Sequence, residues 1–288
     1  MTSRRAICVS RDRGLRGIVE PALASAGVSV EHCDRVPEDT RGAVLVVVDR
    51  ATRQAAGGGL GAIAAPVVIV GDDLDDDELI AAMLDAPVSH LVADPRDRDL
   101  GITSAKLASG DLFGLEKYLA TGAAVGERAI ASDTDKRHAI GGVCAWAEAV
   151  GARPPIVHRL ASVVDELMMN ALSGAPAAGA VLRWGADDHA IAVSVGDSSG
   201  TLRQRDVIDH VRRARRDRGR PLPAHDGHDA PRGAGIGLYL VLGNVASLVV
   251  NVEAGTRTEV VCLFDRTEPG RPAAPAVRSF HVFQAAAR

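Results

Sequence analysis

The sequence predicts an α/β protein with two differently organised halves, a doubly wound parallel sheet followed by an α/β sandwich. In roughly the first hundred residues, short apolar runs alternate with stretches of helical spacing, the order expected for a parallel sheet covered by helices. In the second half, two long helical stretches come first and paired strands follow. A chain of 288 residues is long enough for two such units.

The N-terminal half, residues 1–101, is expected to contain five strands. The third, Ala43–Val48 (AVLVVV), has no polar residue, as expected for a strand covered on both faces. Helical spacing predicts helices at Leu15–Ala26 and Asp77–Leu84, and the glycine-rich Ala55–Ala65 predicts a short helix with a loop. The predicted strands are Ala6–Val9, Val28–Cys33, Ala43–Val48, Pro66–Val70 and Ser89–Ala93.

The stretch Ile102–Gly126 is predicted to be an amphipathic helix, and residues 102–127 are assigned as a helical connector. Its apolar positions between Leu112 and Leu119 are compatible with packing against one half or with a seam in a homodimer. The sequence does not distinguish between these two arrangements.

Residues 128–266 predict the sandwich, in which helices precede antiparallel strands. The proline-rich tail, residues 267–288, contains SFHVF at Ser279–Phe283, whose alternation predicts a strand that docks back onto the protein. The other predicted elements are helices at Asp135–Val150, Pro155–Ser173, Asp206–Arg216 and Ile236–Ala246, and strands at Ala180–Trp184, Ala190–Gly196, Leu248–Glu253 and Thr258–Phe264.

Composition excludes several classes of protein. The net charge of -4 gives no field that would attract nucleic acid or an anionic membrane. Four widely spaced cysteines without a CxxC pair argue against a zinc site or a disulfide framework and fit a reducing compartment. No stretch approaches 18 consecutive apolar residues, and the N-terminal apolar run is too short for a signal peptide. We therefore expect a cytoplasmic protein that binds neither nucleic acid nor membrane.

The segment VVDELMMNAL, residues 163–172, places Glu166 and Asn170 on one face of a helix because they are four positions apart. A carboxylate and an amide oxygen are hard donors that suit Mg²⁺ and can orient a hydroxyl group or a water molecule. The alternative is a solvated polar stripe, which the segment alone does not exclude.

Two turn-like segments carry further candidates. Asp197, in VGDSSG directly after an apolar strand, can accept a hydrogen bond from an exocyclic amine, and Gly200 follows it. Gly255 and Thr256 precede the last strand of the sandwich and can border the same pocket. The alternative for VGDSSG is a simple turn, since Asp, Ser and Gly are common in turns.

The segment GAGIGLYLV contains Gly233, Gly235 and Gly237 and continues into a helix that Leu238 would anchor in the core. Glycines allow backbone N–H groups to approach phosphate oxygens, and a helix N-terminus favours negative charge. A dinucleotide-binding fingerprint is disfavoured, because its glycine loop should follow the first strand of a βαβ unit. Here a loop rich in Pro and Asp precedes the glycines.

The order and spacing of these motifs resemble the GHKL ATPases, the family of histidine kinases, gyrase, Hsp90, MutL and anti-sigma-factor kinases, over about half the chain. The resemblance implies a Bergerat-type fold with ATP and Mg²⁺ as cofactors. It implies that Glu166 is the general base and that Asn170 is the metal ligand. The other positions implied to contact the nucleotide are Asp197, Gly200, Gly233, Gly235, Gly237, Leu238, Gly255 and Thr256.

The sequence departs from the family pattern at the adenine-binding loop. Ser199 and Thr201 stand where the family has glycines. The segment between Gly200 and Gly233 would form a lid over the nucleotide, and it is rich in arginine. These arginines either form a solvated helix or contact the triphosphate or an acidic partner; they are Arg212, Arg213, Arg215, Arg216, Arg218 and Arg220.

The N-terminal half resembles a flavodoxin-like response-regulator receiver domain in its strand pattern. Asp49 stands where the phosphoryl-accepting aspartate would be, but Ser10–Asp12 lacks the acidic pair expected after the first strand. Gly71 replaces a hydroxyl residue, and Asp94 replaces the expected lysine. Because phosphoryl transfer needs positioned cations, the resemblance implies a pseudo-receiver used for interaction.

The resemblance favours a signalling kinase that phosphorylates a serine or threonine on a protein partner, which would be anti-sigma-antagonist-like or another regulatory protein. One alternative is a module that binds ATP without turnover, and another is a scaffold that no longer binds nucleotide. An atypical histidine kinase is the remaining alternative. His138 and His158 are its candidate phosphorylation sites. However, His138 is followed by Ala139 and Ile140 rather than by an acidic residue, and His158 lies inside the helix that carries Glu166.

Overall fold

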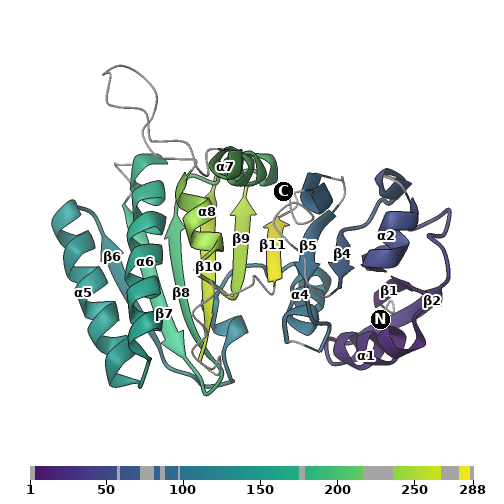
Figure 1. Ribbon diagram of the computed structural model, residues 1–288, viewed down its shortest axis with the longest axis horizontal. Coiled ribbons are helices and arrows are strands. Elements are labelled where there is room, and N and C mark those ends of the chain that lie inside the picture. Colours follow the sequence, from purple (N-terminus) through teal and green to yellow (C-terminus); the bar gives the residue numbers. More distant parts are fainter. Residues whose placement is uncertain are drawn as a thin grey trace.

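A computed structural model describes residues 4–56, 59–71, 81–84, 88–96, 98–174, 179–216, 236–266 and 279–285. Its strands form one mixed sheet of eleven strands in the order β2-β1-β3-β4-β5-β11-β9-β10-β8-β7-β6 (Figure 1). The strands are β1 (Arg4–Val9), β2 (Val28–Cys33), β3 (Ala43–Asp49), β4 (Val67–Val70), β5 (Val88–Val92), β6 (Val125–Ile130), β7 (Ala180–Ala186), β8 (Ala190–Asp197), β9 (Ser247–Glu253), β10 (Arg257–Asp265) and β11 (Ser279–Gln284). The helices are α1 (Arg13–Ala24), α2 (Arg50–Ala56), η1 (Gly59–Ala62), α4 (Arg98–Ser109), η2 (Leu115–Tyr118), α5 (Asp133–Ala149), α6 (Pro154–Gly174), α7 (Gln204–Arg216) and α8 (Ile236–Leu242).

The first five strands pair in parallel and confirm the α/β prediction for this half. The apolar strand β3 is covered on both faces, as predicted. Leu45 and Val47 pack in one core with α1 and α4, whereas Val46 and Val48 pack in the core on the opposite face. The alternation of a strand thus divides a continuous apolar run between two cores.

Strands β6 to β10 form an antiparallel sheet, and α5, α6 and α8 cover one of its faces (Figure 1). Most predicted elements of this half are present with bounds shifted by a few residues. The exception is the helix predicted for Ile236–Ala246, which ends at Leu242. No helix within the described ranges has the length and apolar character needed to cross a bilayer.

Strand β11, which the SFHVF pattern predicts, lies between the two half-sheets: the parallel strands β1–β5 and the antiparallel strands β6–β10. It pairs antiparallel with β5 and parallel with β9. Its side chains Phe280, Val282 and Phe283 are all buried. A strand from the end of the chain therefore makes the sheet continuous.

A buried polar network supports this junction. Lys106 on α4 donates from Nζ to the Tyr118 hydroxyl (2.7 Å) and to Asn251 Oδ1 (2.7 Å). Asn251 Nδ2 in turn donates to Glu259 Oε2 (3.0 Å), and the Lys106 ammonium lies 3.8 Å from the centroid of the Phe283 ring. These bonds compensate for burying the lysine, which is only 1% exposed.

The structure corrects the prediction of a helix through Gly126. Helix α4 ends at Ser109, next to Gly110 with φ 73°, a conformation that terminates helices. Leu112, Leu115, Tyr118 and Leu119 are buried against the sheet on the face opposite α6. They are therefore not available as the seam of a homodimer, and strand β6 occupies the end of the predicted helix.

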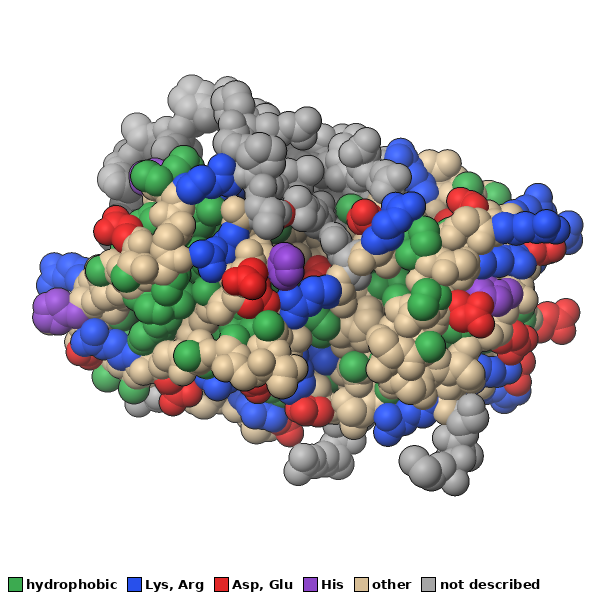
Figure 2. All heavy atoms as spheres, turned by 90° about the horizontal axis from the view of Figure 1, so that it is seen from below, with side chains coloured by type: hydrophobic (Ala, Val, Ile, Leu, Met, Phe, Trp, Pro, Cys, Tyr) green, Lys and Arg blue, Asp and Glu red, His purple; other side chains and the backbone are tan. Residues whose placement is uncertain are grey.

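Charged side chains of both signs are interspersed over the face shown in Figure 2. This distribution agrees with the small net charge of -4. An anionic or cationic partner would therefore have to be recognised locally rather than by a field of one sign over this face.

Candidate functional site

Glu166 and Asn170 lie on α6, the long helix that packs against β8, β10 and α8. Val163, Val164, Leu167 and Met168 are buried on the side of the helix that faces the sheet. Glu166 and Asn170 are only partly buried, since they lie at the margin of this apolar stripe. The sequence therefore places the two polar side chains at the edge of the core, as the four-residue spacing predicts.

The first turn of α8 lies directly against Glu166. A Cβ atom added at Gly237 would overlap the Glu166 carboxylate, so the backbone of α8 approaches this side chain as closely as a glycine allows. The next residue, Leu238, is buried and anchors α8 in the core. We call Glu166, Asn170, Gly237 and Leu238 the α6–α8 cluster.

The environment of Glu166 alters its acidity. Burial raises the pKa of its carboxyl group above the ordinary value, while the Asn170 side chain opposes this shift. The neighbouring Asp165 raises the pKa further and Lys136 lowers it. A carboxylate whose pKa is raised towards neutrality is a better proton acceptor, which is the property of a general base.

Asp197 ends β8 and closes a turn. Its Oδ1 accepts hydrogen bonds from the Ser199 backbone N–H (2.7 Å) and from the Ser199 hydroxyl. Ser199, one of the two departures from the family pattern, thus binds the aspartate directly. Asp197 is partly exposed and pairs in the sheet with Ala180 on one side and Thr258 on the other.

Gly200 connects this turn to the hairpin between β9 and β10. It has φ 57°, and its carbonyl accepts from the Gly255 N–H (3.1 Å). A Cβ atom at Gly200 would lie 2.6 Å from the Thr256 nitrogen, so a larger residue would separate the two turns. We call Asp197, Gly200, Gly255 and Thr256 the turn cluster; Gly255 and Thr256 are exposed in the hairpin turn.

Both clusters lie at the same edge of the sheet. Helix α6 ends at Gly174, and β7 begins at Ala180, the residue paired with Asp197. Only a few residues of sequence therefore separate the last turn of α6, which follows Asn170, from Ala180, the strand partner of Asp197. Of the predicted site, Gly233 and Gly235 lie outside the described residues, as do Arg218 and Arg220.

The residues available for a metal ion are oxygen donors of α6. Among the described residues, no group of three or more His, Cys, Asp or Glu side chains is arranged to hold a metal. Mg²⁺ does not need such a group, since it commonly keeps several waters and combines one or two protein oxygens with phosphate oxygens. The side-chain oxygen of Asn170 fits this mode of binding as a single protein ligand.

The aspartates of the N-terminal half that the receiver resemblance singles out lie at the carboxyl ends of β1 and β3. Asp49 Oδ1 accepts from the Thr52 N–H at 2.5 Å, and Asp12 caps α1 by accepting from the Gly14 N–H at 2.7 Å. Both residues line a cavity of about 580 Å³. Asp94, which replaces the expected lysine, accepts from the backbone N–H of Arg96. Each of these carboxylates has a local backbone partner, which is a structural role.

Comparisons with known proteins add little to this geometry. No protein-family model matches the chain, and no curated protein matches it. Among solved structures, a similar chain occurs in the crystal structure of the SiaB–SiaC complex from Pseudomonas aeruginosa, with 15% sequence identity and a TM-score of 0.35. The match covers 48% of this chain and 88% of that chain. A likeness at this level does not indicate an activity, so function has to be inferred from the residues themselves.

Proposed function

We propose that the C-terminal half, over residues 128–266, binds Mg-ATP between α6 and the glycine segment that precedes α8, with a Bergerat-type arrangement. The observation that carries the proposal is the close approach of α8 to Glu166, whose carboxylate occupies the position that a Cβ atom of Gly237 would take. In this proposal Asn170 holds Mg²⁺, and Gly233, Gly235 and Gly237 bring backbone N–H groups to the phosphates.

The turn cluster would recognise the base. Both intramolecular bonds of the Asp197 carboxylate end on Oδ1, so Oδ2 is the oxygen that an exocyclic amine would meet. Gly200 keeps the β9–β10 turn close to this carboxylate, which places Gly255 and Thr256 beside the same ligand. The serine that replaces a family glycine would thus orient Asp197 rather than block it.

The same site would act as a kinase for a serine or threonine of a regulatory protein. Bound Mg-ATP supplies the phosphoryl group and the positive charge that neutralises it. Glu166 accepts the proton of the attacking hydroxyl, for which its raised pKa is suited. The N-terminal half would be a flavodoxin-like pseudo-receiver that controls or docks the partner, since its Asp12 and Asp49 already bind backbone groups.

A second candidate function is ATP sensing without turnover. The hydrogen bond between the side chains of Asn170 and Glu166 favours it, because a carboxylate already bound by the proposed metal ligand is a poorer proton acceptor. An atypical histidine kinase is less well supported, since His158 is exposed on α6, the helix that also carries Glu166, and so could not approach the nucleotide as a mobile substrate.

A titration with a fluorescent ATP analogue tests the proposal. We expect saturable binding that needs Mg²⁺, and a loss of about tenfold or more in Asn170→Ala and Asp197→Asn. Asp188→Asn, a neutralisation in the β7–β8 turn away from both clusters, is the matched control and should bind like the wild type. Absence of binding to the wild type would refute both ATP-dependent functions. Binding without ADP or phosphoprotein formation would leave the sensor function.

A further inference from the structure

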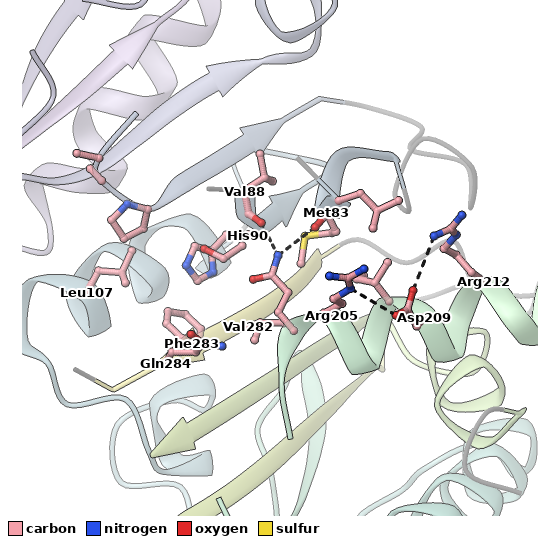
Figure 3. A pocket seen from close by; sticks show the side chains of 17 residues that line it. Met83, Val88, His90, Leu107, Arg205, Asp209, Arg212, Val282, Phe283 and Gln284 are labelled. Atoms are coloured by element: carbon pink, nitrogen blue, oxygen red, sulfur yellow. Dashed lines mark hydrogen bonds and ion pairs between the residues drawn. The ribbon is translucent and has the colours of Figure 1, made fainter. Parts of the chain in front are cut away.

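A second cavity, of about 680 Å³, lies where the two half-sheets meet (Figure 3). Strands β5 and β11, the segment before β4 and the first turns of α7 contribute to its walls. Its volume falls within the range of small-molecule sites, about 300–1,000 Å³, and such sites favour junctions of this kind. It shares no residue with the α6–α8 cluster or the turn cluster. We call it the junction cavity.

The two sides of the junction cavity are held together by Gln204, at the start of α7. Its Nε2 donates to the carbonyl oxygens of Met83 (3.1 Å) and Val88 (2.6 Å). Figure 3 shows Val88 and His90 on one side of the cavity, and Arg205 and Asp209 on the helix at the other side. The cavity is therefore bordered by a direct contact between the halves rather than by a loose gap.

Most of the inner wall is apolar. Met83, Val88, Ile208, Val282 and Phe283 all line it and are all buried. The imidazole of His90 also lines it, with Nδ1 lying 3.3 Å from His281 Nδ1. Burial lowers the pKa of His90 well below its ordinary value, so this ring is neutral near pH 7. The inner wall thus favours an uncharged, apolar body.

Among the described residues that line the cavity, two arginines and one carboxylate lie at the rim. Arg205 and Arg212 both pair with the single carboxylate of Asp209, at 3.8 Å and 3.7 Å. These distances exceed hydrogen-bond length, so the guanidinium N–H groups keep donor capacity for another anion. Arg212 is the more enclosed of the two, with 39% of its side chain exposed compared with 87% for Arg205.

We propose that the junction cavity binds a small organic anion with an apolar body. The body lies against Pro66 and Leu84, accessible apolar residues of the lining, and the anionic group lies at the rim beside Arg212. Such a ligand contacts the N-terminal half of the protein and α7. This site shares no residue with the α6–α8 cluster or the turn cluster, although Arg212 belongs to the segment that the resemblance assigns to the lid.

A pair of matched fluorescent probes tests the proposal with the full chain. 1-Anilinonaphthalene-8-sulfonate has an aromatic body and a sulfonate, and N-phenyl-1-naphthylamine has the same body without the charge. We expect the wild type to bind one equivalent of the sulfonate, more tightly than the neutral probe. Arg212→Gln should weaken the sulfonate about tenfold, as expected for one charge-assisted contact, and leave the neutral probe unchanged.

Two further variants locate the probe. Ala64 is exposed and lines the cavity, so Ala64→Trp should fill it without disturbing the fold and weaken both probes. Arg11→Gln removes an equal charge at the cavity beside Asp49 and should change neither affinity. Equal binding of the two probes by the wild type would overturn the proposal. So would unchanged affinity in both Arg212→Gln and Ala64→Trp, or a loss in Arg11→Gln instead. Circular dichroism of each variant checks that it is folded.

Discussion

Gly237 lies against the carboxylate of Glu166, so the position of each residue depends on the other. A methyl group at Gly237 would overlap the carboxylate and push it, or α8, out of place. In Gly237→Ala we therefore expect ATP affinity to fall at least tenfold, measured by calorimetric titration.

Gly141→Ala is the matched control, because Gly141 is also helical but a Cβ atom there would meet nothing within 4 Å. That substitution should leave ATP affinity unchanged and stabilise the fold by about 0.5–1 kcal/mol, since alanine is the better helix former. Equal ATP affinity in both variants would show that the Gly237 contact does not border the ligand.

Substitution of Glu166 separates an effect on catalysis from an effect on ATP binding. Glu166→Gln keeps the shape of the side chain but removes the proton acceptor, so we expect ATP to bind and its turnover to fall about 10²-fold or more. The measurement is the release of ADP under saturating ATP, alone and with candidate protein substrates. Asp165→Asn, on the adjacent position of α6, removes an ion pair with Lys136 and a charge that raises the pKa of Glu166, so it should lower turnover far less than Glu166→Gln. Retained turnover in Glu166→Gln would exclude this residue as the base.

Periodicity predicted most elements because their burial is regular. The run AVLVVV and the helix containing Glu166 have apolar positions that follow the strand or helix repeat. Strand β6 was missed because it is an edge strand whose middle residues, Glu127 and Arg128, are exposed. The helix predicted through Gly126 does not form, because Gly110 and Gly114 adopt positive φ and redirect the chain.

The place of β11 could not be predicted, although its alternation was visible. Its partners β5 and β9 come from opposite halves of the chain, and pairing between distant segments has no local signal. For the same reason Lys106 gave no sign of being buried, since its partners Tyr118, Asn251 and Phe283 are spread along the chain. The junction cavity, which β11 helps to line, was likewise not foreseen.

The junction strand should contribute strongly to stability. Phe283 is 1% exposed and contacts the Lys106 ammonium through its ring. Phe283→Ala should lower the free energy of unfolding by about 3–5 kcal/mol, measured by urea denaturation. Gln284→Ala, at the exposed end of the same strand, should change it by less than about 0.5 kcal/mol. Similar values for the two variants would mean that β11 is only loosely attached.

The whole molecule should be sensitive to acid because two histidines are buried at the junction. Burial, together with the charge of Lys106, lowers the pKa of His281 to about 3, and burial also lowers that of His90. The unfolded chain takes up these protons at about pH 6.5, whereas the folded protein does not. Stability should therefore fall as the pH is lowered from about 6.5 towards 3, by up to about 1.4 kcal/mol per pH unit for each histidine.

Urea denaturation at several pH values measures this dependence. His281→Phe should make it less steep, because the variant has one fewer histidine to protonate on unfolding. His158→Phe is the control, since His158 is exposed on α6 and should leave the pH dependence as it is in the wild type. A wild-type stability that stays constant between pH 6.5 and 4 would contradict the burial of neutral histidines at this junction.

The proposed position of the nucleotide is between α6, α8 and the turn that follows β8. Photolabelling with 8-azido-ATP, followed by peptide mapping, tests it most directly. We expect saturable labelling that requires Mg²⁺, is prevented by ATP, and is found in peptides containing residues 197–201 or 255–258 beside the adenine. Labelling confined to residues 11–56, or to the peptides that line the junction cavity, would contradict it.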